Sequence, residues 1–182
     1  AGKYIFNKFI RSNFIDVDTS FGERDNIYDH KFKKNNNTIV GWGKLKYNLC
    51  TDSNGFRSSC KNQFSSLKEF DLAFLGDSFT EPVGINFENS FVGIISSHMK
   101  EKRIANLAVS SYSPSIHFAK INFLLSKGYK FKEIIIFIDL SDIVDDTVCY
   151  KLNKHIIERR NSYSDCYKQD LNLQDKISDF FK

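Results

Sequence analysis

Short apolar runs alternate with longer segments of helical spacing from residue 71 onwards. Three runs have the composition of buried strands: 71–75, 104–109 and the β-branched run 133–139. Between them, residues 88–102 and 114–127 carry apolar residues at helical spacing. Continuous apolar strands separated by helices are typical of a parallel sheet that helices cover on both faces. The pattern therefore predicts an α/β doubly wound core over residues 71–148.

The N-terminal part of the chain lacks this regularity. Aromatic residues are interleaved with Asn, Lys and Asp, and the run 33–37 (KKNNN) reads as a polar loop. Residues 42–49 (WGKLKYNL) alternate in part, which predicts a strand, and 51–55 (TDSNG) have the composition of a turn. We expect residues 1–70 to form an irregular N-terminal layer that packs on the core.

The C-terminal part is polar after residue 148, with a candidate helix over 173–182 whose apolar residues share one face. Nothing in it indicates a second domain. We therefore expect one domain over residues 1–182, in which 149–182 form a C-terminal segment that is itself incomplete.

Charge and hydropathy exclude two classes of partner. The net charge is only +4 and is spread along the chain without a basic arm, which gives no footprint for nucleic acid. The longest apolar stretches, such as 133–140, are far shorter than the ~20 residues that cross a bilayer. We expect neither a nucleic-acid partner nor a membrane span. The sequence leaves open an export signal or anchor upstream of Ala1.

Four cysteines fall as two pairs, Cys50 with Cys60 and Cys149 with Cys166. Neither pair has the tight spacing of a zinc site, and both suit a short disulfide-closed loop. We expect at least one disulfide, which places the protein in the periplasm or outside the cell. The alternative is four thiols in a cytoplasmic protein.

The clearest chemical feature is the segment 76–81 (GDSFTE), directly after the first predicted strand. Gly76 allows a tight turn at the strand end, and Ser78 would project its hydroxyl from the carboxyl edge of the sheet. The backbone N–H of Ser78 could also help to bind a developing oxyanion. Taken alone, such a tripeptide is more often a turn or a helix cap.

The surrounding sequence resembles the SGNH or GDSL-like hydrolase family of the exported bacterial type. Residues 75–91 (LGDSFTEPVGINFENSF) resemble its first block, and 51–57 (TDSNGFR) resemble the lead-in to that block. Residues 106–114 (NLAVSSYSP) are similar to the second block, and 138–143 (IDLSDI) stand in place of the third. The resemblance spans roughly residues 47–146. It implies a three-layer α/β/α fold with a parallel sheet.

Carried over residue by residue, the resemblance implies that Ser78 is the nucleophile and Asp77 a supporting residue of the motif. Ala108 matches a small residue that offers a second oxyanion N–H. Asp142 occupies the third-block position, where the family usually has an Asn donor. An ionised Asp would repel an oxyanion, so Asp142 must be protonated, turned away or used for another purpose.

The general base is the main departure from the family. Its members place an Asp-x-x-His near the C-terminus, and this sequence has none. His30 is the first candidate among the four histidines, while His98, His117 and His155 are more easily explained as structural residues. Two accounts remain: the Asp-x-x-His lies beyond Lys182, or the scaffold has kept the fold and lost the activity.

Two weaker features complete the candidates. Four acids follow the last predicted strand and could bind Mg²⁺ or Ca²⁺, although loop acids that cap a turn explain them more simply; they are Asp139, Asp142, Asp145 and Asp146. We therefore expect no metal and no cofactor. Trp42 and some of the tyrosines could form a sugar-stacking surface, while most aromatic residues belong to the core.

The function that these features predict is acyl transfer. Ser78 would attack an ester carbonyl, and water or a sugar hydroxyl would resolve the acyl-enzyme, giving an esterase or an acetyltransferase. The family favours acyl groups on a cell-envelope or secreted glycan as substrate. The rival is a non-catalytic module that binds glycan or protein. A nucleotide-binding fold would need a Gly-rich turn after the first strand, and the sequence has none.

Overall fold

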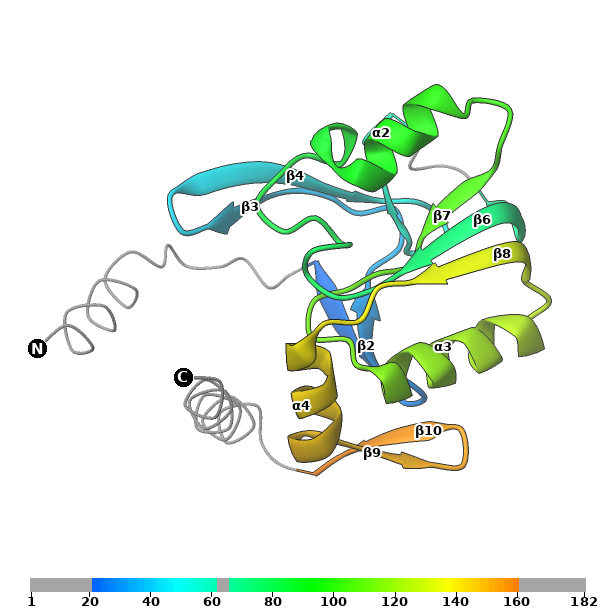
Figure 1. Cartoon of the computed structure of the whole chain (residues 1–182). Helices are drawn as coiled ribbons and strands as arrows, with labels where there is room; N and C mark the ends of the chain where they lie inside the picture. The colour runs from blue at the N-terminus through cyan, green and yellow to red at the C-terminus, as the bar shows by residue number, and fades with distance from the viewer. Residues whose placement is uncertain (1–20, 62–65, 161–182) are drawn as a thin grey trace, which may run out of the picture.

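The computed structural model describes residues 21–61 and 66–160 and shows a mixed α/β fold (Figure 1). A six-stranded sheet has the strand order β3-β4-β5-β7-β6-β8. Its strands are β3 (Asn37–Trp42), β4 (Leu45–Thr51), β5 (Arg57–Ser58), β6 (Glu69–Leu75), β7 (Ile104–Asn106) and β8 (Lys130–Ile136). The described helices are α2 (Phe91–His98), α3 (Pro114–Ser126) and α4 (Leu140–Val148), with a 3₁₀ turn, η1 (Phe87–Asn89), before α2.

The predicted strands β7, β6 and β8 are parallel neighbours, which confirms that part of the prediction. Alternate residues of β6 point to opposite faces of the sheet. Phe74 meets the ring of Phe91 in α2, with centroids 5.9 Å apart. Ala73 and Leu75 instead share a buried cluster with Leu124 of α3. The two helices thus pack on opposite faces of β6, and Figure 1 shows them on opposite sides of the parallel strands.

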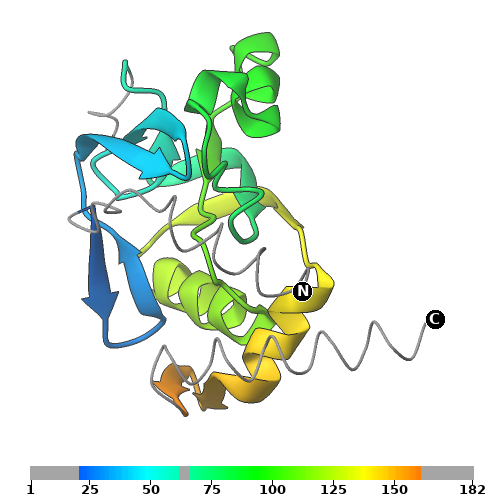
Figure 2. The ribbon, with the colours of Figure 1, turned by 90° about the vertical axis from the view of Figure 1, so that its left-hand side faces the viewer.

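Residues 21–61 and 66–70, the described part of the N-terminal layer, are not irregular, and for them that expectation is wrong. β3 and β4 form an antiparallel hairpin, and β5 joins this hairpin to β7, so the sheet is mixed instead of parallel. The single strand predicted over 42–49 is interrupted because Gly43 adopts a positive φ of 59° in the hairpin turn. A second hairpin, β1 (Gly22–Asp25) with β2 (Asp29–Phe32), forms a separate two-stranded sheet, which Figure 2 shows in blue.

The third sequence block leads into α4, which the apolar pattern did not predict. After α4, β9 (Tyr150–Asn153) and β10 (Ile156–Arg159) form an antiparallel hairpin. The candidate helix over 173–182 lies outside the described residues.

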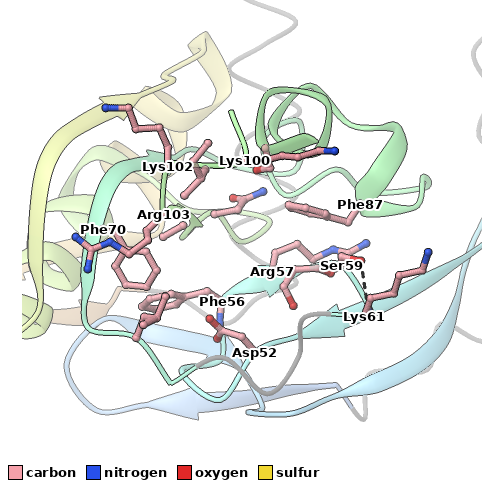
Figure 3. A pocket seen from close by; sticks show the side chains of 16 residues that line it. Asp52, Phe56, Arg57, Ser59, Lys61, Phe70, Phe87, Lys100, Lys102 and Arg103 are labelled. Atoms are coloured by element: carbon pink, nitrogen blue, oxygen red, sulfur yellow. Dashed lines mark hydrogen bonds between the residues drawn. The ribbon is translucent and has the colours of Figure 1, made fainter. Parts of the chain in front are cut away.

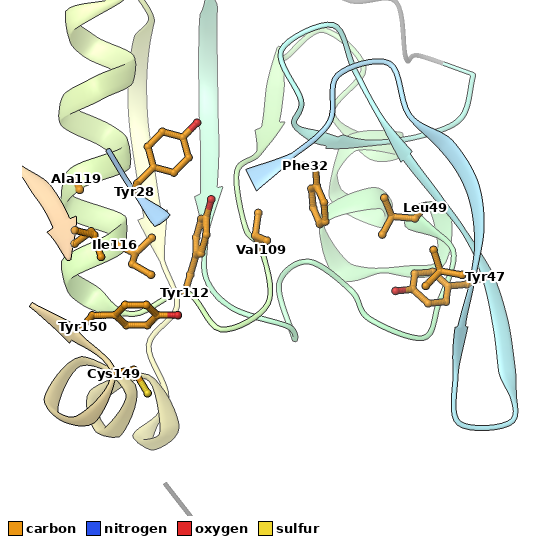
Figure 4. Packing of buried hydrophobic residues seen from close by; sticks show 12 residues of the cluster. Tyr28, Phe32, Tyr47, Leu49, Val109, Tyr112, Ile116, Ala119, Cys149 and Tyr150 are labelled. Carbon is orange, nitrogen blue, oxygen red and sulfur yellow. The ribbon is translucent and has the colours of Figure 1, made fainter. Parts of the chain in front are cut away.

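A buried apolar cluster connects the N-terminal hairpins to the C-terminal half. Figure 4 shows it running from Ala119 and Tyr150 beside α3, through Tyr112, to Tyr47 and Leu49 on β4. Tyr112 is fully buried, and its hydroxyl donates a hydrogen bond to the carbonyl of His30 at 2.8 Å. This cluster fixes β2 against the loop that follows β7.

The apolar run of β8 was expected to be buried, and in the structure it is exposed. Side chains from Ile134 to Ile138 are between 37% and 52% exposed. The reason is that β8 is the outermost strand of the sheet, and no other described strand pairs with its second edge.

One disulfide joins Cys50 in β4 to Cys60 after β5, with Cα atoms 5.0 Å apart, which confirms that at least one pair is bridged. Cys149 is buried, and Cys166, its partner in the prediction, lies outside the described residues. Among the helices of residues 21–61 and 66–160, none has the length and apolar character needed to cross a membrane.

Candidate functional site

The turn that carries Ser78 follows β6 directly. A Cβ on Gly76 would lie 2.2 Å from Oγ1 of the buried Thr80, so only glycine fits there without displacing the turn. The N–H of Glu81 donates to the carbonyl of Asp77 at 2.9 Å, and the N–H of Val83 donates to that of Ser78 at 3.0 Å. These bonds fold the chain back on itself and leave Ser78 partly exposed at the carboxyl end of a central strand.

Asp77 holds this turn in place. Its Oδ1 accepts the N–H of Phe79 at 3.0 Å, and its Oδ2 accepts the hydroxyl of Ser78 at 3.1 Å. The nucleophile predicted from sequence therefore donates to the neighbouring carboxylate in this structure.

The third sequence block lies next to that turn, because β6 and β8 are parallel neighbours and their carboxyl ends meet. Asp139 caps α4 by accepting the N–H of Ser141 at 2.7 Å and that of Asp142 at 3.2 Å. Asp142 in turn accepts the N–H of Asp139 at 3.0 Å. This reciprocal capping box lies next to Asp77, and one carboxylate oxygen from each of Asp77, Asp139 and Asp142 lies within 4.8 Å of the others.

Asp142 is buried, with 2% of its surface exposed. Burial raises the pKa of its carboxyl group to about 7, and the nearby carboxylates of Asp77, Asp139 and Asp145 act in the same direction. A carboxyl group with that pKa holds a proton close to neutral pH. A protonated carboxyl group does not repel an oxyanion, and this was one of the conditions for an acid at the third-block position.

Substituting Asp142→Asn should stabilise the protein, and more so at pH 8 than at pH 5. Because the pKa of Asp142 is raised, the folded state keeps a proton that the unfolded state has already released between pH 3.8 and about 7. Stability is thus lost as the pH rises through this window, and the Asn variant lacks that loss. We expect a gain of about 1–3 kcal/mol at pH 8, measured by urea unfolding.

Glu133→Gln, on the exposed part of β8, is the matched control and should leave stability unchanged at both pH values. An Asp142→Asn effect of the same size at pH 5 and pH 8 would show that the charge of Asp142 is not the cause.

The other two acids of the predicted cluster, Asp145 and Asp146, do not belong to this group of three carboxylates. Asp146 accepts the hydroxyls of Ser113 at 2.5 Å and Ser115 at 2.9 Å, where it ties α4 to the first turn of α3. Asp145 accepts the N–H of Cys149 through its carbonyl. In the group formed by Asp77, Asp139 and Asp142, the carboxylates of Asp139 and Asp142 already accept the hydrogen bonds that cap α4. We therefore assign no metal site.

Ala108 is buried, and its N–H already donates to Oδ1 of Asn106 at 3.1 Å. Asn106 also donates from Nδ2 to the carbonyl of Thr80 at 2.7 Å, which anchors the second block to the Ser78 turn. An oxyanion would have to displace Asn106 to use the Ala108 N–H. Sequence reasoning gave Asn106 no role, although it is the first residue of the second sequence block; in the structure it ends β7.

His30 bonds to the second block and not to Ser78. Its Nδ1 lies 2.8 Å from Oδ2 of Asp29, and its Nε2 lies 2.8 Å from the carbonyl of Ser110. Both ring nitrogens are therefore engaged in this arrangement. His30 would have to leave these partners to serve Ser78.

In the described residues, none of the other three histidines forms a hydrogen bond with Ser78 either. His117 is buried in α3, and burial lowers its pKa to about 4. His98 and His155 are exposed, the first at the end of α2 and the second in the β9–β10 turn. Within the described residues, Ser78 is therefore bonded to a carboxylate and to no imidazole.

A cavity of about 460 Å³ lies between the two N-terminal hairpins and the Ser78 turn. Glu81 lines it and is 2% exposed; its Oε2 accepts both the N–H of Ser110 at 2.5 Å and the Ser110 hydroxyl at 2.7 Å. Burial raises the pKa of Glu81, although the Ser110 bonds oppose this effect. Sequence reasoning did not single out Glu81, whose signal was its place at the end of the GDSFTE segment.

A larger cavity, of about 600 Å³, is lined by side chains of β5, of β7 and of the segment after α2 (Figure 3). It contains several basic side chains, but two of them are bonded to groups of the protein. Arg57 donates to the carbonyl of Asn48 at 2.8 Å, and Arg103 pairs with Asp71 at 3.5 Å. None of the site residues predicted from sequence lines this cavity.

Comparison of the chain with family models, with curated proteins and with solved structures found no match. The structure defines a mixed α/β protein with a serine turn at the carboxyl edge of its parallel strands. Membership of the SGNH family remains a prediction that rests on the sequence blocks.

Proposed function

We propose that this protein is a serine esterase or O-acetyltransferase of the SGNH type, with the three-layer fold of that family. Ser78 would act on ester-linked acyl groups of a cell-envelope or secreted glycan. The observation that supports this most is the position of Ser78 on a tight turn at the carboxyl end of β6. Its hydroxyl donates to Asp77, and the carboxylate of Asp77 lies within 4.8 Å of that of the buried acid Asp142. The Cys50–Cys60 disulfide is compatible with an oxidising compartment and supports an exported protein.

In the proposed mechanism, Oγ of Ser78 attacks the ester carbonyl carbon and passes its proton to a general base. The carbonyl π electrons move to oxygen, and the N–H of Ser78 and the protonated carboxyl of Asp142 stabilise that oxyanion. Collapse of the intermediate expels the alcohol, which takes up the proton. Water or a sugar hydroxyl then releases the acyl group from Ser78.

The general base is the component that this chain lacks in the described arrangement. Asp77 accepts the Ser78 hydroxyl, but a carboxylate is a weak base for this proton. The resemblance assigns the role to an Asp-x-x-His segment, so we expect only slow turnover by residues 1–182.

Hydrolysis of p-nitrophenyl acetate tests this proposal. We expect a rate above the buffer background that falls at least about 10-fold in Ser78→Ala, since loss of a nucleophile removes the covalent route. Ser126→Ala is the matched control, because Ser126 is an exposed serine at the end of α3. Acetyl-enzyme detected by mass spectrometry on Ser78 would identify the attacked residue.

Equal rates in the wild-type protein and Ser78→Ala would reject catalysis by this chain and favour a second candidate function. That candidate is a non-catalytic glycan- or protein-binding module. It is favoured because groups that catalysis would need are already hydrogen-bonded within the protein. The Ala108 N–H donates to Asn106, and both ring nitrogens of His30 have partners.

A further inference from the structure

The 460 Å³ cavity next to the Ser78 turn has the size of a ligand pocket. Glu81 and Val83 of the turn form part of its wall, and the rest comes from the β1–β2 and β3–β4 hairpins and the loop after β7. Its lining is rich in aromatic side chains, namely Phe21, Phe32, Trp42, Tyr47 and Tyr150. Figure 4 shows Phe32 and Val109 in the space between Tyr47 and Tyr112.

The charged groups around this cavity are paired with one another. Arg159 and His30 both bind the buried carboxylate of Asp29. Lys31 pairs with Asp25 at 2.9 Å and with Glu23 at 3.5 Å. Because these charges are compensated within the protein, they give no reason to expect a charged ligand.

Glu81 is the exception among the polar groups of the cavity. Both hydrogen bonds from Ser110 go to Oε2, and in the described part of the chain no donor bonds to Oε1. The same residues contain no cation within salt-bridge distance of Glu81. Oε1 is not fully enclosed by the protein, so a ligand in the cavity that offers a hydroxyl can donate to it.

We infer that this cavity binds one saccharide unit of a neutral glycan, with its ring against Trp42 and Tyr47 and a hydroxyl at Oε1 of Glu81. Apolar ring faces and a ring of hydroxyl groups match a pocket of aromatic walls with one buried polar anchor. An acyl chain would fill the aromatic walls and leave Glu81 unsatisfied. As the substrate site of an esterase the inference rests on the proposed function, because it places the glycan beside Ser78.

Trp42 gives a direct readout, because it is the only tryptophan in the sequence. We would titrate the Ser78→Ala protein with xylotriose, cellotriose, mannotriose and chitotriose and follow its intrinsic fluorescence. We expect a saturable change with at least one trisaccharide below about 20 mM. Glu81→Leu should weaken that binding at least about 10-fold, while Glu81→Gln, which still offers polar atoms to a hydroxyl, should stay within about 3-fold.

Glu158→Leu, on the exposed side of β10, is the control and should bind as the parent does. If Glu81→Leu does not fold, Val83→Phe places a ring into the cavity and should abolish the response. The inference is overturned if no trisaccharide gives saturation, if Val83→Phe leaves the response intact, or if hexanoate alone saturates it.

These titrations separate the two proposals because they need no catalysis. Failure to bind alongside Ser78-dependent hydrolysis would reject the saccharide site and keep the esterase. Binding without hydrolysis would keep the saccharide site and identify a glycan-binding module.

Discussion

Gly76→Ala should destabilise the protein by about 1–3 kcal/mol, which is the range for forcing a methyl group into packed structure with backbone displacement. The added Cβ would lie 2.2 Å from Oγ1 and 2.7 Å from Cβ of Thr80. Thr80 cannot yield easily, because it is 1% exposed and its carbonyl accepts Nδ2 of Asn106. The turn that presents Ser78 must therefore shift.

The two distances predict a graded rescue in double variants. Thr80→Ala removes Oγ1 but keeps the Cβ contact, so it should restore part of the stability that Gly76→Ala removes. Thr80→Gly removes both atoms and should restore more of it, after its own cost is subtracted in a double-mutant cycle. Urea unfolding of the singles and doubles measures the coupling. Strict additivity would mean that Gly76 is not in contact with Thr80 in solution.

The parallel half of the fold was predictable because its signal is local. The runs that became β6, β7 and β8 are apolar enough to be recognised without knowledge of their partners. The same holds for α3. The helix predicted over 88–102 begins later because Ser90 accepts the N–H of Gly93 at 3.0 Å and so caps α2. A serine before an apolar run is an N-cap signal that was available.

α4 was missed although its start carries a signal. Asp139 and Asp142 stand three residues apart, which is the spacing of a capping box with acids in both positions. We interpreted these acids as loop acids that cap a turn, and that interpretation did not extend the turn into a helix. The proximity of Asp142 to Asp77, the residue before Ser78, by contrast, follows from the rule that the carboxyl ends of parallel strands meet.

The contacts that join Glu81, Ser110 and His30 could not be predicted from the hydrophobic pattern. Glu81 and Ser110 are linked through β6 and β7, but the contact of His30 with Ser110 spans 80 residues. That contact depends on how the β1–β2 hairpin packs against Tyr112, and no periodicity in the N-terminal sequence encodes this packing. Long-range pairing of polar hairpins is set by tertiary contacts, so His30 could be identified as a candidate while its partners could not.

Lys120→Met should remove a rise in stability with pH that the wild-type protein shows between pH 7 and pH 9. Lys120 is 3% exposed and donates to the carbonyl of Leu107 at 2.7 Å and to the hydroxyl of Tyr112 at 3.1 Å. Burial lowers its pKa from 10.5 to about 7. In this window the folded state has released a proton that the unfolded state still binds, so stability increases as the pH rises.

The expected rise is about 2 kcal/mol over these two pH units, because one group contributes at most about 1.4 kcal/mol per unit. Lys120→Met keeps the length of the side chain and cannot titrate, so its stability should be flat over this window. At pH 6 we expect the variant to equal or exceed the wild type, since the relief of a buried charge offsets the lost bond to Leu107. Lys127→Met, an exposed lysine at the end of the same helix, should retain the wild-type slope. A Lys120→Met protein that keeps the slope would show that another group titrates in this range.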